Sequence, residues 1–209
     1  NIICGILEDT HGNLWVSSNK GLIRFTPATE KITTFDVGDG LYISEFHFKT
    51  CFKDVDGSMY FGGIGGYIHF HPDSIKANPT PPPMIFTGFK VFDQYLQFDS
   101  SMATKKVVYL SHTNNFFTIE FAVLDYANSL KNQYRYKLEG VDEQWRQTNG
   151  THPYASYTNV PAGDYTLWVQ GSNSDGVWNN EGIQMTIVIH PAWWQISWFK
   201  AVIALIAIG

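Results

Sequence analysis

Residues 134–178, YRYKLEGVDEQWRQTNGTHPYASYTNVPAGDYTLWVQGSNSDGVW, decide the fold of this chain. A period of two is the pattern of a strand with one buried face, and this stretch contains two such runs. The alternating positions are Tyr134, Tyr136 and Leu138 in the first run and Tyr165, Leu167 and Val169 in the second. The second run directly follows the turn-forming residues VPAGD at 160–164. Two half-buried strands of a β-sandwich are therefore predicted.

Tyr165 stands where a tyrosine corner would place it, at the start of a strand and just after Pro161-Ala162-Gly163-Asp164. In such a corner the tyrosine hydroxyl reaches back to the upstream backbone, which gives a buried phenol a hydrogen-bond partner. Tyr165 is therefore predicted to be structural. The corner by itself predicts a fold and no activity.

The same stretch resembles the Y_Y_Y domain. The residues that carry the resemblance are Tyr134, Tyr136, Trp145, Tyr157-Thr158-Asn159, Pro161, Gly163-Asp164-Tyr165-Thr166 and Ser172-Asn173-Ser174-Asp175-Gly176-Val177-Trp178. The Y_Y_Y domain is the membrane-proximal, immunoglobulin-like domain of bacterial propeller-type sensors, many of them hybrid two-component systems that detect glycan fragments. The resemblance implies structural roles for Tyr134, Tyr136, Tyr157 and Tyr165.

Strand patterns continue on the amino-terminal side of this stretch, after a proline-rich segment at 77–83. Its prolines lack amide donors and favour extended backbone, so the segment is predicted to be a semi-rigid linker. Strands are then expected at 84–91, 107–110, 116–124, 133–138, 154–158, 164–172 and 184–190. Short strands at this spacing are typical of an immunoglobulin-like sandwich, here predicted to span 84–190.

Residues 1–76 contain an internal repeat. The motif Asp-x-x-Gly-x-apolar-aromatic-apolar/aromatic at 9–16, followed by Gly-x-Ile-x-Phe-x-Pro at 21–27, recurs 45 residues later at 54–61 and 66–72. A period of this length is typical of β-propeller blades. The units resemble the two-component regulator propeller repeat. Residues 1–76 are therefore predicted to be the carboxy-terminal blades of a propeller.

The segment 191–209 changes character from polar strand to aromatic and apolar residues. Trp193, Trp194 and Trp198 form an aromatic belt that leads into the apolar run AVIALIAIG at 201–209. A spanning helix needs about twenty apolar residues, so this segment is predicted to be the membrane interface and the start of a transmembrane helix. A buried helix of a soluble protein is the alternative.

Composition and motif searches argue against several functions. The chain of 209 residues has 14 basic and 19 acidic side chains and no basic stripe, so no nucleic-acid partner is expected at this portion. It contains no nucleophile elbow, no phosphate-cradling glycine loop and no metal-ligand spacing. We therefore expect no catalytic residue, no metal and no cofactor here.

Three smaller features have structural interpretations. The turn Asp54-x-Asp56-Gly57 lacks the downstream ligands of a calcium loop and is interpreted as a hairpin turn. His69 and His71 lie two residues apart and are interpreted as a blade edge. Cys4 and Cys51 lie in apolar runs and are predicted to be buried thiols, although a disulfide stays open in an oxidising compartment.

One polar and aromatic loop is a candidate for ligand binding. Aromatic faces with nearby amides and carboxylates are a composition that suits saccharides, and the candidate residues are Asn173, Asp175, Trp178 and Asn179. The alternative is a strand-connecting turn in which Asp175-Gly176 reverses the chain and Trp178 plugs the core.

These patterns predict an all-β chain, with the last blades of a β-propeller, an immunoglobulin-like β-sandwich and the start of a transmembrane helix. The resemblance implies the extracytoplasmic sensor portion of a hybrid histidine kinase in the bacterial inner membrane, with this portion in the periplasm. It implies an oligosaccharide ligand, a homodimer and a signal relayed across the membrane to a kinase domain outside these residues. The alternative is an extracellular propeller enzyme, such as a polysaccharide lyase, with an accessory immunoglobulin-like module.

We predict that the two halves of the chain differ in autonomy. A propeller blade buries its faces against two neighbours, which an isolated 1–76 fragment lacks, whereas a sandwich has a core of its own. The 1–76 fragment should aggregate or stay molten, and the 84–190 fragment should unfold cooperatively. Near-ultraviolet circular dichroism melts of both fragments check this, and a cooperative transition in 1–76 would contradict it.

Overall fold

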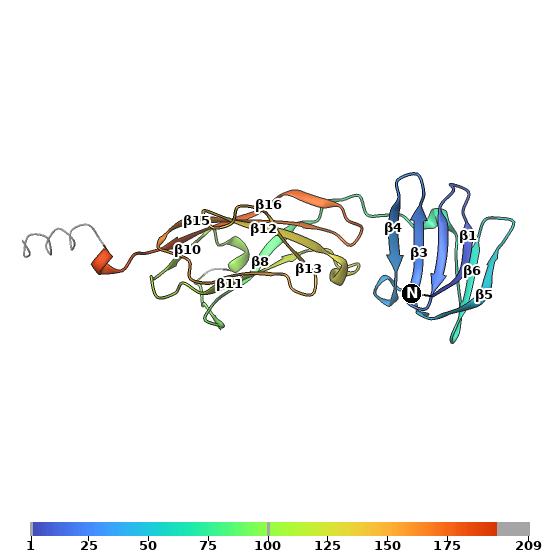
Figure 1. Ribbon diagram of the computed structural model, residues 1–209, viewed down its shortest axis with the longest axis horizontal. Coiled ribbons are helices and arrows are strands. Elements are labelled where there is room, and N and C mark those ends of the chain that lie inside the picture. The colour runs from blue at the N-terminus through green and yellow to red at the C-terminus, as the bar shows by residue number, and fades with distance from the viewer. Residues whose placement is uncertain (1, 100, 196–209) are drawn as a thin grey trace, which may run out of the picture. The chain divides into compact units, whose positions relative to one another are not determined.

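The computed structural model describes residues 2–99 and 101–195. The chain divides into two compact units, Asn1–Pro79 and Thr80–Gly209, whose strands are labelled in Figure 1. Each unit is all-β, apart from short 3-10 turns.

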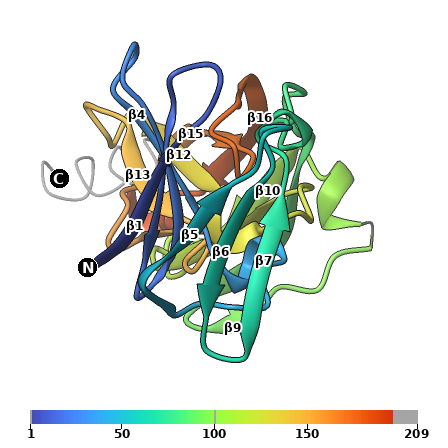
Figure 2. The same cartoon turned by 90° about the vertical axis from the view of Figure 1, so that its right-hand side faces the viewer.

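The first unit consists of two antiparallel sheets. The first sheet has the order β1-β2-β3-β4, with strands Ile3–Glu8, Leu14–Ser18, Gly21–Thr26 and Lys31–Phe35. The second sheet has the order β5-β6-β7, with strands Phe46–Lys53, Met59–Gly63 and Gly66–Phe70 (Figure 2). The 3-10 turns η1 (Val37–Asp39) and η2 (Pro72–Ser74) follow β4 and β7. The sequence repeat therefore corresponds to the hairpins β2-β3 and β6-β7.

The Asp-x-x-Gly turn before β2 has a clear physical origin. The Asp9 carboxylate accepts hydrogen bonds from the backbone N–H groups of His11 and Asn13, both at 2.9 Å, and from the Trp15 indole at 3.0 Å. Burial raises the pKa of the Asp9 carboxyl, but the hydrogen bonds from Asn13, Trp15 and His11 outweigh burial and hold that pKa below its usual range. Gly12 has φ 76°, a left-handed conformation that favours glycine.

Trp15 joins the two sheets of the first unit. Its side chain is fully buried, and its ring stacks on Phe35 of its own sheet at 5.6 Å and contacts Phe70 of the other sheet at 4.8 Å. Cys4 and Cys51 are free thiols; Cys4 is buried, as predicted, and Cys51 is partly buried. The outer faces of the sheets still expose large apolar side chains, including Ile6, Ile32, Phe52 and Tyr67.

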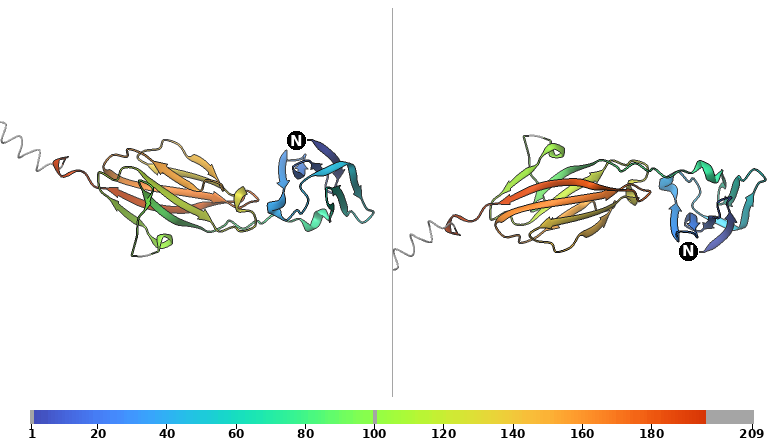
Figure 3. Two further views of the ribbon diagram at one scale, coloured as in Figure 1. Left: turned by 90° about the horizontal axis from the view of Figure 1, so that it is seen from below. Right: turned by 90° about the horizontal axis from the view of Figure 1, so that it is seen from above.

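The second unit is a sandwich of two sheets. One sheet has the order β14-β11-β8-β9, with strands Tyr154–Tyr157, Phe117–Val123, Met84–Val91 and Gln94–Tyr95. The other has the order β10-β16-β15-β12-β13, with strands Val107–Leu110, Trp178–Ile189, Gly163–Ser172, Gln133–Glu139 and Arg146–Asn149. The right-hand view of Figure 3 shows β15 and β16 running side by side along the sandwich. Three further 3-10 turns are Met102–Thr104, Ser129–Lys131 and Trp193–Gln195.

The strand at the carboxy-terminal end is longer than predicted. β16 begins at Trp178 and not at 184, because the β15-β16 hairpin continues its pairing through Gly171↔Asn179 and Ser172↔Trp178. The extension was not predicted because the polar run NNEG at 179–182 lacks an apolar period. The short polar edge strands β9 and β13 escaped prediction for the same reason.

Two tyrosine hydroxyls of the sandwich make hydrogen bonds with the backbone. The Tyr134 hydroxyl on β12 accepts a hydrogen bond from the Val123 backbone N–H on the opposite sheet at 3.1 Å. The Tyr165 hydroxyl donates to the Pro161 carbonyl at 3.0 Å, which is the contact expected of a tyrosine corner. The rings of Tyr134 and Tyr136 both pack against Phe121 in the core.

Tyr157 donates a hydrogen bond to the buried carboxylate of Asp142 at 2.5 Å. The same carboxylate accepts from the Leu138 backbone N–H at 2.9 Å and pairs with the Arg146 guanidinium at 2.6 Å. Burial, followed by the hydrogen bond to Asp142, raises the pKa of the Tyr157 phenol far above its usual range. Asp142 therefore ties β14 to the end of β12.

The chain leaves the sandwich after β16. β10 pairs in parallel with the end of β16, and the His190 N–H donates to the Leu110 carbonyl at 2.9 Å. Trp193 and Trp194 lie in the following 3-10 turn and are exposed. Trp198 and the predicted start of a membrane helix at 201–209 lie outside the described residues, and within 2–99 and 101–195 no helix is long and apolar enough to cross a membrane.

We predict that the two tyrosine-to-phenylalanine variants differ in cost. Tyr157→Phe removes a buried donor from a charged carboxylate and should lower the free energy of unfolding by about 1.5–3 kcal/mol. Tyr165→Phe removes a neutral, partly exposed hydrogen bond and should cost only about 0.5–1.5 kcal/mol. Urea denaturation of the two variants and the parent measures both free-energy differences. Equal costs would show that the hydrogen bond from Tyr157 to the charged Asp142 carboxylate is worth no more than the neutral one from Tyr165.

Candidate functional site

The loop that follows β15 is organised by Asn173. This side chain is buried, with 1% of its surface exposed, and its Oδ1 accepts from the backbone N–H groups of Asp175 at 3.1 Å and Val177 at 2.8 Å. Its Nδ2 donates to the Thr80 carbonyl at 3.4 Å. Asn173 therefore closes the turn and also contacts the linker that precedes the sandwich.

Asn179 makes a second contact with the linker. Its Nδ2 donates to the Pro82 carbonyl at 2.9 Å, while its Oδ1 accepts from the backbone N–H groups of Glu181 at 3.1 Å and Gly182 at 3.0 Å. The Leu124 N–H completes the attachment by donating to the Pro83 carbonyl at 2.9 Å. We call these contacts of Asn173, Asn179 and Leu124 with residues 80–83 the linker clasp.

Trp178 stacks against an arginine and is only partly buried. The guanidinium carbon of Arg135 lies 4.9 Å from the centre of the Trp178 ring and 5.4 Å from the centre of the Trp145 ring. Arg135 is held in place because its Nε donates to Gln170 Oε1 at 2.6 Å and its Nη2 donates to Asn180 Oδ1 at 3.2 Å. Pairing of planar cations with aromatic faces is favourable and orients both partners.

A hollow of about 360 Å³ lies beside Trp178. β12 and β13 both contribute to its lining, where they pair through Gln133↔Asn149 and Tyr134↔Thr148. Its lining residues are Gln133, Tyr134, Gln147, Thr148, Asn149 and Trp178. Primary amides can donate and accept hydrogen bonds, and an indole offers a broad apolar face, so this lining suits a polar but uncharged ligand.

The four residues predicted from the sequence to bind ligand make different contacts in the structure. Trp178 lines the hollow, whereas Asn173 and Asn179 use their amides on the loop itself and on the linker. Asp175 takes part in the turn through its backbone N–H. Binding of ligand by these residues stays a prediction.

The amide residues of the hollow were missed by sequence reasoning. Gln133, Gln147 and Asn149 lie at the polar end of β12 and on the edge strand β13. Neither segment has an apolar period of its own at these positions. Only the pairing of β12 with β13 brings the three side chains to the same place as Trp178.

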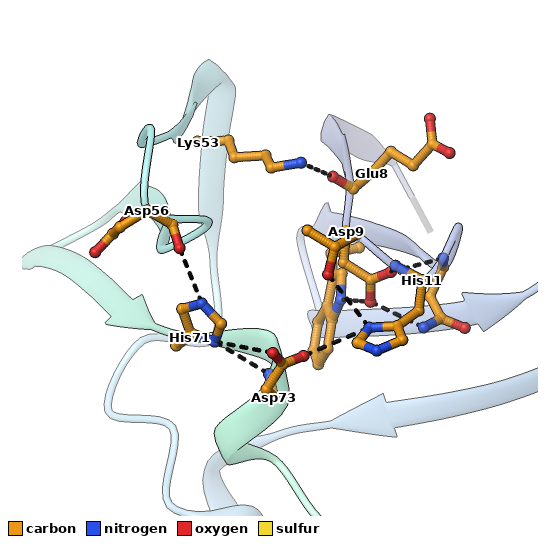
Figure 4. Close-up of polar contacts among 10 residues, drawn as sticks. Glu8, Asp9, His11, Lys53, Asp56, His71 and Asp73 are labelled. Carbon is orange, nitrogen blue, oxygen red and sulfur yellow. Dashed lines mark hydrogen bonds and ion pairs between the residues drawn. The ribbon is translucent and has the colours of Figure 1, made fainter.

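A second polar cluster lies between the blades of the first unit (Figure 4). The rings of His11 and His71 both point toward Asp73, with nitrogen-to-oxygen distances of 3.4 Å and 3.8 Å. Lys53 Nζ donates to the Glu8 carbonyl at 2.9 Å, which is another bond between the two blades. A hollow of about 320 Å³ beside this cluster is lined by Asp9, His11, Asn13, Arg24, Pro72, Asp73 and Ile75.

The histidines of the second blade do not converge. The His69 ring stacks on Tyr60 at 4.4 Å, whereas His71 Nε2 lies 3.1 Å from the Asp56 carbonyl oxygen. Among the residues with described placement, no group of three or more His, Cys, Asp or Glu side chains is arranged to hold a metal ion. The cluster in Figure 4 therefore joins turns of neighbouring blades.

Comparison with known proteins matches part of the sandwich to a family. Residues 125–190 match the Y_Y_Y domain family. Over 216 aligned residues and 100% of its length, the chain is 35% identical to histidine kinase P4 of Formosa agariphila. It spans only 16% of that relative.

Two solved structures resemble the chain as well. The extracellular domain of a putative hybrid two-component system of B. thetaiotaomicron is 26% identical, with a TM-score of 0.76, over 90% of this chain and 26% of that one. The extracellular domain of a putative one-component system of the same organism is 22% identical, with a TM-score of 0.52, over 91% of this chain and 25% of that one, and supports the fold alone. The chain is thus similar to extracellular domains of bacterial sensors.

We predict that Asn179→Asp opens the linker clasp without unfolding the loop. Aspartate keeps the oxygen that accepts from Glu181 and Gly182 but replaces the donor to the Pro82 carbonyl by a second acceptor. Loss of one hydrogen bond should speed amide exchange at Leu124 by about tenfold, because this N–H is protected by the Pro83 carbonyl.

Hydrogen exchange followed by NMR measures this effect. The Val123 N–H is the internal control, since it bonds to the Tyr134 hydroxyl and not to the linker. Equal acceleration at Leu124 and Val123 would indicate general destabilisation, and no change at Leu124 would show that Asn179 does not hold the linker.

Proposed function

We propose that this chain, with its Y_Y_Y domain, is the extracytoplasmic sensor portion of a membrane-bound hybrid histidine kinase. The observation that carries the proposal is the match to a histidine kinase along the whole chain, joined to a likeness to the extracellular domain of a hybrid two-component system. The sensor would lie in the bacterial inner membrane, with this portion in the periplasm and the kinase domain elsewhere in the full-length protein. The comparisons favour this assignment over an extracellular propeller lyase.

We propose further that the ligand is an oligosaccharide. The hollow beside Trp178 supports this class, because amide side chains and an indole face match the hydroxyls and the apolar faces of sugars. Binding would alter the population of two sensor states, which requires that the ligand contact them differently. The present portion binds and relays, and the chemistry of phosphotransfer belongs to the kinase domain.

β16 is the element best placed to carry a signal through the sandwich. It begins at Trp178, beside the hollow and the linker clasp, and ends at Ile189, where the chain leaves the domain. It pairs with β15 over most of its length and with β10 at its end. A strand held on both sides moves with its sheet, so a displacement at one end of the domain would reach the other.

The exit from the sandwich is stiff. His190 is held by the Leu110 carbonyl and stacks on the Tyr109 ring at 5.8 Å, while Trp194 contacts the His112 ring at 5.2 Å. Pro191 fixes its own φ and keeps the preceding residue extended. We also propose that the sensor is a homodimer. In a homodimer, such an exit would convert a displacement of the sandwich into a change in the spacing or angle of two membrane helices.

We predict that a flexible insertion at this exit uncouples ligand from output. Adding Gly-Ser-Gly-Ser between His190 and Pro191 of the full-length sensor should leave ligand affinity unchanged, because no binding residue moves, and should abolish ligand-dependent kinase output. Autophosphorylation in membrane vesicles gives the output, and calorimetry gives the affinity. Replacing Trp193, Trp194 and Trp198 by Ala should instead shift the basal output, through the depth of the helix.

The same four residues inserted at the exposed Phe92-Asp93 hairpin turn are the control, because this insertion leaves the His190-Pro191 connection unchanged and should leave output intact. A full ligand response in the exit variant would contradict rigid coupling and favour ligand-controlled dimerisation.

A further inference from the structure

We propose that the hollow beside Trp178 is a subsite for an uncharged saccharide segment, which stacks on the Trp178 indole and hydrogen-bonds to Gln147 and Gln133. The proposal rests on the proposed sensor function. It adds the location of a ligand subsite and the charge of the ligand that binds there. A volume of about 360 Å³ lies at the small end of the usual range for small-molecule sites, roughly 300–1,000 Å³, so the subsite takes a short segment of a chain.

The Trp178 ring is oriented before any ligand arrives. Arg135 covers one of its faces at 4.9 Å and is itself fixed by Gln170 and Asn180. A sugar can therefore stack only on the opposite face of the indole. Because the ring is already held, binding costs little side-chain entropy, and a rigid aromatic platform gains affinity for that reason.

Gln147 supplies a free amide on the rim of the hollow. It lies on the edge strand β13 and is exposed, and its side chain makes no hydrogen bond within the described part of the chain. Gln133 lies on the neighbouring strand β12, opposite Asn149, and is likewise exposed and lines the hollow. An amide offers two donors and one acceptor oxygen, which matches a sugar hydroxyl that both donates and accepts.

Three other side-chain oxygens of the hollow are already engaged. The Thr148 hydroxyl donates to the His152 carbonyl at 2.6 Å, and the Asn149 Oδ1 accepts from the Thr151 N–H at 3.1 Å. The Tyr134 hydroxyl is occupied by the Val123 N–H. Gln133 and Gln147 therefore offer complete amide groups for polar recognition.

The electrostatics of the lining select a neutral ligand. None of the six lining residues carries a charge at neutral pH. A carboxylate or sulfate in such a site would gain most from a facing cation. The guanidinium of Arg135, which lies opposite Gln147 on β12, is already engaged with two indole rings and donates to Gln170 and Asn180. Uncharged sugar units should therefore bind better than uronic acids or sulfated units.

The position of the subsite links it to the linker clasp. Trp178 is adjacent in sequence to Asn179, whose amide holds the Pro82 carbonyl. A ligand stacked on Trp178 therefore lies one residue from a contact between the sandwich and the linker. Occupancy of the hollow would stabilise the start of β16 and, with it, the clasp.

The experiment compares three variants of the 209-residue chain. Trp178→Ala removes the platform, and Gln147→Ala removes an edge-strand amide that supports no fold contact. Trp145→Ala is the matched control, because Trp145 stacks on the same arginine but does not line the hollow. Circular dichroism melts establish that each variant is folded before binding is measured.

The probes are neutral gluco-, xylo-, manno- and galacto-oligosaccharides of four to six units, with oligogalacturonate of the same length as the anionic counterpart. Isothermal titration calorimetry measures Kd. We expect at least one neutral probe to bind, with Kd raised about tenfold or more by Trp178→Ala, about three- to tenfold by Gln147→Ala and less than about twofold by Trp145→Ala. Oligogalacturonate should bind at least about tenfold more weakly than the neutral probe.

Several results would overturn the proposal. A neutral sugar that binds the parent, the Trp178 variant and the Gln147 variant equally would place the saccharide site elsewhere and leave the sensor function intact. Preference for oligogalacturonate would refute the electrostatic argument, and binding of none of the probes would refute the subsite. The sensor function is judged separately, by the kinase output of the full-length protein, so its failure is distinguishable from failure of the subsite.

Discussion

The attachment of the proline-rich linker is the constraint on which this end of the molecule depends. Pro81, Pro82 and Pro83 contribute carbonyl oxygens and no N–H groups, so they can join the sandwich only as acceptors. The donors come from Asn173, Asn179 and the Leu124 backbone. The hydrogen bonds from these donors hold the loop after β15 in place. The loop leads directly into β16 at Trp178, and Trp178 lines the hollow. A single requirement for hydrogen-bond donors thus shapes the candidate site.

Tyr134 and Tyr157 are buried, and their hydroxyls make hydrogen bonds inside the sandwich. Tyr134 bonds to the backbone of the opposite sheet, and Tyr157 bonds to Asp142 beyond the end of β12. Each hydrogen bond gives a buried polar group a partner and stabilises the folded state by about 1 kcal/mol or more. Arg135, on the outward side of the same strand β12, is stacked between Trp145 and Trp178. β12 therefore carries the buried Tyr134 on one face and the stacked Arg135 on the other.

β16 connects the two ends of the sandwich that the proposed relay would use. Its first residue belongs to the hollow, and its last residues pair with β10 just before the chain passes through His190 and Pro191. The Trp193-Trp194 turn follows without a flexible spacer. A sheet that pairs this strand on both sides transmits displacement better than a loop would, because its hydrogen bonds resist local deformation.

The sequence by itself determined the elements with a strong period: most strands of the sandwich, the two hairpins of the blade repeat and the corner at Tyr165. Hydrophobic period, turn residues and motif spacing are local features, so they can be recognised in the sequence alone. The short polar strands β9 and β13, and the extension of β16 to Trp178, have no such period and were decided by pairing. The candidate site was likewise a tertiary outcome. The amides of Asn173 and Asn179 meet a linker some 90 residues earlier in the chain, and the hollow unites β12, β13 and β16. Which donor meets which acceptor over such distances follows from strand register and sheet order, and a local pattern contains neither.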